Sequence, residues 1–265
     1  MSMLALALLV LGVTPSQEAF DAGTAAYRAG DYAAAASNFA LVAASDPGNA
    51  PVFYNLGNAF NGMGRPGPAV AAYERALQLD PALDAARQNR DKVLAQTKRN
   101  MAKPLPPDWE QALFFWAERI AAPRLFLTGL LLWAFFWAFL ALRLVRPLPW
   151  HRLTASLLAL VCLLFLGAAW AKSHPQRLAV ASDAEVPVYF AKDSADSPRF
   201  LLHEGDRVLV ERIDPEWVLV STVGGERGWV PNGAMTLVES PQTAPVLGQE
   251  QPPSDTAQSV GNKES

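Results

Sequence analysis

Two long uncharged segments constrain the fold of this chain more than any other feature of its sequence. One runs from Leu125 to Leu142 and the other from Leu153 to Ala171, and each is bounded by Arg or Lys. As α-helices they would be about 27–28 Å long, close to the hydrocarbon thickness of a bilayer. Buried core helices are the alternative, but uninterrupted apolar runs of this length with tryptophan among them favour a membrane. We therefore predict transmembrane helices over 125–144 and 153–171.

The charges near these two helices predict their orientation. The turn from Arg143 to Arg152 holds three Arg and one His, and an excess of Arg in a short loop marks the cytoplasmic side. Near the start, Leu4 to Val13 is an apolar run too short to span a bilayer, which is typical of a secretory signal. Residues 1–15 are then a cleaved signal peptide or a retained anchor, and 145–152 form a cytoplasmic loop. Both soluble parts of the chain are expected outside the cytoplasm.

The segment before the hairpin repeats itself after 34 residues, because Asp46-Pro47 and Asp80-Pro81 each close an Ala-rich helical stretch. The second copy places large, small and aromatic residues at regular positions: Phe53, Leu56, Gly57, Phe60, Ala69, Tyr73, Ala76 and Pro81. This pattern resembles the tetratricopeptide repeat, a pair of closely crossing helices. The first copy is looser but keeps Gly23. We predict repeats over 16–49 and 50–83, followed by a polar capping helix over 84–99.

So short an array buries little core, and it is expected to lean on a partner, on a second copy or on the membrane-proximal helix. That helix is predicted over 108–123, where Trp109, Leu113, Trp116 and Ile120 share one face. Such a stripe favours an amphipathic helix in the membrane interface. Docking of the same stripe against the repeats is the alternative.

A peptide-binding groove is the functional hypothesis for the repeats. In arrays of this kind the first helix of each repeat lines the concave face, and Asn side chains there can hydrogen-bond an extended backbone. Lys92 could meet a carboxylate. An exposed polar helix face would look the same in the sequence. The candidate groove residues are Tyr27, Arg28, Tyr54, Asn55, Asn58, Asn61, Asn89 and Lys92.

From Leu178 the pattern changes to short strands separated by turns. Alternating valines, such as Val208 and Val210, with several turns in about 60 residues predict a small closed β-barrel. The runs His203-Glu204-Gly205-Asp206 and Gly228-Trp229-Val230-Pro231 resemble the bacterial SH3 domain over 178–238. The tail, 239–265, is rich in Pro, Gln and Ser and is predicted to be disordered.

Four residues of this module are candidates for an aromatic groove that takes an extended peptide: Tyr189, Trp217, Trp229 and Pro231. The alternative is that the aromatic residues fill the core of a small barrel. The Asn-Val-Arg segment common in that family is replaced by Val186-Pro187-Val188-Tyr189, which weakens any transfer of its cell-wall recognition.

Nothing in the sequence indicates catalysis or a cofactor. One Cys and three His cannot build a four-ligand Cys/His zinc site of the usual spacing. A net charge of −3 gives no field that would attract nucleic acid. No G-x-x-x-x-G-K, H-E-x-x-H or paired-Cys motif occurs. We predict a protein that is not an enzyme, with no cofactor and no metal.

The whole order of segments resembles the BatE-type proteins of aerotolerance operons: a signal, two tetratricopeptide repeats, an interfacial helix, a membrane hairpin and an SH3-like domain. The resemblance implies the bacterial inner membrane, with a MoxR-type AAA+ ATPase and von Willebrand factor A-domain membrane proteins as partners. The leading hypothesis is a non-enzymatic scaffold on the envelope side. The alternative is a cell-wall sensor that binds peptidoglycan stem peptides through its SH3-like domain.

Overall fold

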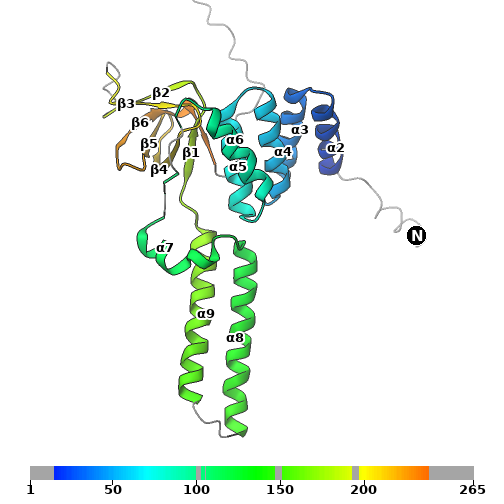
Figure 1. Cartoon of the computed structure of the whole chain (residues 1–265), viewed down its shortest axis with the longest axis vertical. Helices are drawn as coiled ribbons and strands as arrows, with labels where there is room; N and C mark the ends of the chain where they lie inside the picture. Colours follow the sequence, from blue (N-terminus) through cyan, green and yellow to red (C-terminus); the bar gives the residue numbers. More distant parts are fainter. Residues whose placement is uncertain (1–14, 100–102, 105, 147–150, 193–196, 239–265) are drawn as a thin grey trace, which may run out of the picture.

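The computed structural model describes residues 15–99, 103–104, 106–146, 151–192 and 197–238. Figure 1 shows three parts: a helical repeat region, a β module beside it, and a long helical hairpin below both. The predicted tail, almost all of the predicted signal segment and the middle of the predicted cytoplasmic loop lie outside the described residues.

The repeat region consists of antiparallel helices that follow the predicted period: α2 (Pro15–Arg28), α3 (Tyr32–Ser45), α4 (Ala50–Gly62), α5 (Pro66–Leu79) and α6 (Asp84–Gln96). The side chains of Asp31 and Asn49 accept hydrogen bonds from the first turns of α3 and α4, as residues of this type do at helix N-termini. Gly57 lets α4 and α5 cross closely, because a Cβ atom there would lie 2.6 Å from the Tyr73 ring. Gly23 stands in the same relation to Phe39. In both repeats, therefore, a glycine on the first helix and an aromatic residue on the second allow the two helices to cross closely.

The hairpin is formed by α8 (Ala122–Val145) and α9 (His151–Ser173), which are long and apolar enough to cross a membrane. Their mean hydropathy is 2.2 over each candidate span, and most of their large apolar side chains face outward. The helices lie close together where Gly129 meets Leu166 and where Cys162 Sγ donates a hydrogen bond to the Gly129 carbonyl.

The spacing i, i+4 and i+7 of small residues also predicts a close helix contact through Ala134, Ala138 and Ala141 on α8 and through Ala155, Ala159 and Cys162 on α9. For α8 that is wrong, because its three alanines are exposed. On α9, Cys162 is buried and Ala155 and Ala159 are half-buried, as expected. Spacing alone places small residues on one face of a helix but does not say which face meets the neighbour.

The predicted continuous helix over 108–123 is also wrong. The chain forms α7 (Asp108–Phe114) and a 3₁₀ turn η1 (Phe115–Ala117), and α8 begins at Ala122. Pro123 explains the break: it fits the first turn of a new helix but not the interior of an old one, and the N-cap residue Ala121 has extended backbone. The apolar stripe is divided. Trp109 and Leu113 are exposed, whereas the Trp116 ring packs at a tilt against Phe165 of α9, with 4.8 Å between the ring centroids.

The β module contains a five-stranded antiparallel sheet in the order β6-β5-β4-β1-β7 and a separate hairpin of β2 and β3. The strands are β1 (Leu178–Ala181), β2 (Glu185–Val188), β3 (Phe200–His203), β4 (Arg207–Ile213), β5 (Trp217–Ser221), β6 (Arg227–Pro231) and β7 (Met235–Leu237); the 3₁₀ turn η2 (Asn232–Ala234) precedes β7. The predicted closed barrel is not found among the described strands. The two sheets are joined by a single bridge, Tyr189 to Trp229, because the ladder of β2 continues along β3 rather than along β6.

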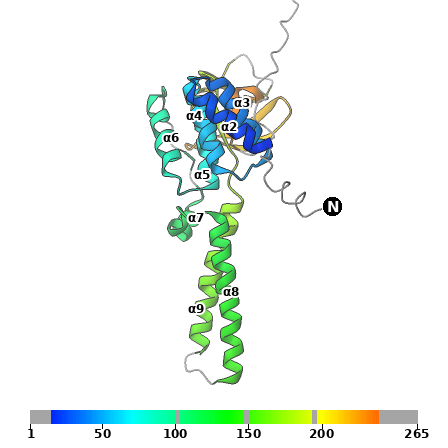
Figure 2. The same cartoon turned by 90° about the vertical axis from the view of Figure 1, so that its right-hand side faces the viewer.

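The repeat region and the β module pack into one soluble unit, which the sequence does not predict. Leu178 and Val180 of β1 belong to the same buried cluster as the repeat residues. The backbones approach so closely that a Cβ on Gly67 would lie 2.4 Å from the Ala181 carbonyl oxygen. Figures 1 and 2 both show α5 and the β module side by side above one end of the hairpin. The short repeat array is therefore stabilised by packing against the β module of its own chain.

Candidate functional site

A hydrogen-bond network organises the groove side of the repeats around Asn58 on α4. Its Oδ1 accepts hydrogen bonds from the Tyr73 hydroxyl at 2.7 Å and from Asn89 Nδ2 at 2.8 Å. Asn89 also lies 3.4 Å from the Tyr54 hydroxyl. Burial raises the pKa of the Tyr73 phenol, which therefore stays protonated and remains a donor. Side-chain hydrogen bonds thus link α4, α5 and α6 beneath the groove, although the bonded residues are far apart in the sequence.

Next to this network lies a pocket of about 220 Å³ between α2, α3 and α4. Its walls combine aromatic rings with polar groups: Phe20, Thr24, Tyr27, Arg28, Phe39, Asn55 and Asn58. Four of the predicted groove residues therefore meet in one place. Asn61 and Lys92 are exposed and do not line this pocket. Phe20 and Phe39 were not predicted as site residues, because at the repeat spacing they read as core.

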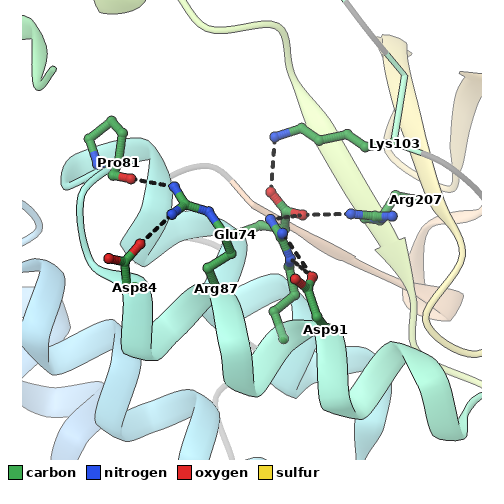
Figure 3. Close-up of polar contacts among 8 residues, drawn as sticks. Glu74, Pro81, Asp84, Arg87, Asp91, Lys103 and Arg207 are labelled. Carbon is green, nitrogen blue, oxygen red and sulfur yellow. Dashed lines mark hydrogen bonds and ion pairs between the residues drawn. The ribbon is translucent and has the colours of Figure 1, made fainter. Parts of the chain in front are cut away.

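The junction between the repeats and the β module contains a fully buried carboxylate, Glu74 of α5. Its partners come from three different segments, and Figure 3 shows two of them, Lys103 and Arg207. Arg207 of β4 donates at 2.9 Å, Lys103 of the linker at 2.9 Å and Arg90 of α6 at 3.2 Å. Arg207 is itself almost fully buried. One carboxylate therefore ties the β module, the capping helix and the linker toward the hairpin to a single point.

Electrostatics keeps Glu74 ionised in this position. Burial opposes the charged form, but the surrounding Lys103, Arg90 and Arg207 outweigh it, so the pKa of Glu74 lies below its ordinary value. A second acid supports the junction: Glu204, in the turn after β3, accepts a hydrogen bond at 3.1 Å from the Gly67 amide in the first turn of α5. Glu204 is thus a structural partner of the repeats.

Acid should weaken this junction. Because the pKa of Glu74 is lower in the folded protein than its ordinary value of 4.5, the ion pairs contribute their full stability above that value. The contribution is lost as the pH falls through the folded-state pKa. Amide hydrogen exchange of α5 and β4, measured from pH 6 down to pH 3, should show falling protection. A Glu74→Gln chain lacks this titration, so an identical pH profile in that variant would contradict the assignment.

The four candidate residues of the β module also come together. Tyr189 packs edge-on against Trp217 at 5.7 Å between centroids, Tyr189 bridges to Trp229, and Trp217 is opposite Pro231 in the ladder. All four are half-buried, while the core is filled by the alternating valines of β4 to β6. Sequence reasoning missed Lys192, which lies 4.3 Å above the Trp229 ring and is paired with Asp214.

Comparison with known families identifies one part of the chain. Residues 50–83 match the family model described as tetratricopeptide repeat, with the same bounds as the predicted second repeat. No match was found among curated proteins. Within the described ranges, no group of three or more His, Cys, Asp and Glu side chains is placed to hold a metal ion. The site that the fold defines is a surface for protein partners, of the kind that tetratricopeptide repeats provide.

Proposed function

We propose that this protein is a non-enzymatic, membrane-anchored adaptor of the BatE type that holds a partner protein through its repeat groove. The observation that carries the proposal is the pocket between α2 and α4, where aromatic walls and amide groups meet on a tetratricopeptide scaffold. A von Willebrand factor A-domain membrane protein or a MoxR-type AAA+ ATPase is the proposed partner, on the basis of the sequence resemblance alone.

The pocket suits an extended peptide with one apolar side chain. Phe20 and Phe39 would take that side chain, since they form the apolar wall. Asn55 would bond the peptide backbone, as would the amide nitrogen of Asn58, because the Oδ1 of Asn58 already accepts two hydrogen bonds. Exposed Arg28 at the rim would attract a carboxylate. The groove thus favours peptides with an acidic group next to an apolar residue.

Membrane anchoring explains the hairpin. Both connections to the soluble unit leave it at the same end, so α8 and α9 together return the chain to one side (Figures 1 and 2). Arg143, Arg146 and Arg152 lie toward the opposite end. By the distribution of Arg around short loops, that end faces the cytoplasm and the soluble unit lies outside it, in the periplasm of the proposed inner-membrane protein.

Partner capture in intact cells tests the groove. The full chain is crosslinked, purified in detergent, and its co-purifying molecules are quantified by mass spectrometry. The Arg28→Ala and Asn55→Ala chain should recover about tenfold less of the specific partner, because two polar contacts are lost. Asn61→Ala is the matched control, since Asn61 is exposed on the same helix as Asn55 but outside the pocket. Undiminished capture by the double variant would remove the groove from the proposal.

The aromatic surface of the β module favours a second candidate, the cell-wall sensor. Tyr189, Trp217 and Trp229 are assembled and half-buried. The Lys192 ammonium above Trp229 is paired with Asp214, but its further N–H donors could meet a stem-peptide carboxylate. The same experiment separates the two functions. Recovery of muropeptides that falls with Trp217→Ala, but not with the groove variants, would replace the adaptor with the sensor. The full chain is required, because β1 is part of the core shared with the repeats.

A further inference from the structure

A recess lies between the soluble unit and the upper end of the hairpin, outside the groove and the aromatic surface. It consists of a pocket of about 480 Å³ and a smaller one of about 140 Å³. The two share five lining residues, so they adjoin: Pro106, Glu110, Glu118, Ala171 and Lys172. The larger pocket reaches up to Leu77 of the repeats and Leu209 of the β module, and the smaller one reaches down to Ala168 of α9.

The two ends of this recess differ in polarity. Its lower end is bounded by Phe114, Phe115 and Ala168, and Ala168 lies within the apolar span of α9. The neck that the two pockets share carries both signs of charge, the Lys172 ammonium and the carboxylates of Glu110 and Glu118. In the upper part, Lys103 is already bonded to Glu74. A ligand that fits both ends has an apolar chain and a headgroup with a negative and a positive group.

Lys172 at the shared neck has capacity for such a headgroup. Its ammonium donates to the carbonyl oxygens of Glu118 and Ile120, each at 2.8 Å. An ammonium group has three N–H donors, so one remains after these two bonds. Over the part of the chain that the structure describes, no carboxylate lies within ion-pair distance of Lys172. A phosphate oxygen would complete its bonding and neutralise its charge.

We infer that this recess binds one membrane phospholipid with a phosphoethanolamine headgroup. The phosphate meets Lys172, the primary ammonium meets Glu110 and Glu118, and an acyl chain follows Phe114 and Ala168 toward the bilayer. The two carboxylates beside Lys172 at the neck favour this zwitterionic headgroup over an anionic one, because they can bind its ammonium. The inference rests on the proposed insertion of the hairpin, which puts the lower pocket at the edge of the bilayer.

Lipid retention by the full chain tests this site. The protein is purified in mild detergent with equal amounts of phosphatidylethanolamine and phosphatidylglycerol, and bound lipid is counted by native mass spectrometry. Wild type should retain one phosphatidylethanolamine in preference to phosphatidylglycerol. Lys172→Gln should retain about tenfold less, because a charge-assisted hydrogen bond is lost. Ala171→Leu should lose it as well, since its larger side chain fills the neck without altering charge.

Arg124→Gln is the matched control. Arg124 is exposed in the first turn of α8, at the same end of the hairpin, but does not line either pocket. This variant should retain lipid as wild type does. Equal retention by Lys172→Gln and Ala171→Leu, or equal retention of both lipids by wild type, would overturn the inference. Carbonate extraction of membranes tests insertion separately: release of the wild-type chain would overturn the proposed anchoring, whereas retained insertion without selective lipid binding would overturn only the lipid site.

Discussion

Replacing Glu74 with Gln should lower the free energy of unfolding of the soluble unit by about 3–5 kcal/mol, the cost of breaking a buried ion pair on one side. The substitution keeps the shape of the side chain but removes the charge that Arg207 and Arg90 face. Arg207 would then be a buried cation without its carboxylate. Hydrogen exchange of α5 and β4 in the full chain, in detergent, measures the loss directly.

Glu185→Gln is the control for that experiment. It makes the same chemical change at the same junction, where Glu185 pairs with Lys98 at 2.9 Å, but both groups are exposed. Exposed ion pairs contribute little because water screens them, so protection of α5 should stay close to that of wild type. Equal effects of the two variants would mean that burial of Glu74 is not what holds the junction.

Removing the Tyr73 ring should be equally severe for the repeats. Tyr73 is fully buried against Gly57, and its hydroxyl supports Asn58 below the groove. Tyr73→Ala leaves a cavity that costs about 3–5 kcal/mol, which would lower the midpoint of thermal unfolding by roughly 10 °C. Circular dichroism of the full chain in detergent measures this transition through the loss of the signal from the repeat helices.

Tyr73→Phe separates packing from hydrogen bonding in the same position. It keeps the ring and removes one hydrogen bond, with an expected cost of about 1 kcal/mol. The free energy of unfolding should therefore change little in this variant. The amount of captured partner should still fall clearly, since Asn58 loses one of the two donors that orient it. A Tyr73→Ala chain that melts together with Tyr73→Phe would show that the ring does not support the repeat core.

Local patterns were enough to predict the helices of the repeat region and of the hairpin. The 34-residue period predicts the second repeat within its matched bounds, because Gly57 and Tyr73 are required by the crossing of two adjacent helices. The uncharged runs likewise predict α8 and α9, and valine alternation predicts β4 and β5, whereas β3 and β7 were not predicted. Each of these signals can be read from residues close together in the sequence. The meeting of Tyr27, Arg28, Asn55 and Asn58 follows from the same repeat register.

Long-range contacts were beyond such patterns. Glu74 and Arg207 are 133 positions apart. From the sequence, each of them taken alone is predicted to be a solvent-exposed charged residue. One indication was present: α5 is apolar around most of its circumference, and a helix of that kind is buried on more than one side. Ten of its residues, Glu74 among them, are buried in the structure. The helix break before Pro123 could have been predicted from the proline itself, but the amphipathic stripe favoured one continuous helix.

The chain passes between the hairpin and the soluble unit twice, and both passages are fastened. The first carries Lys103, which is bonded to Glu74, and the second leads directly into the buried strand β1. A single flexible linker would let the groove change its orientation and its distance from the membrane surface. Two fixed connections hold the groove at one distance from the membrane. A partner whose binding segment lies at the same distance therefore meets the groove at a high effective concentration. Partners anchored in the same membrane gain most from this arrangement, whereas freely diffusing ones gain little.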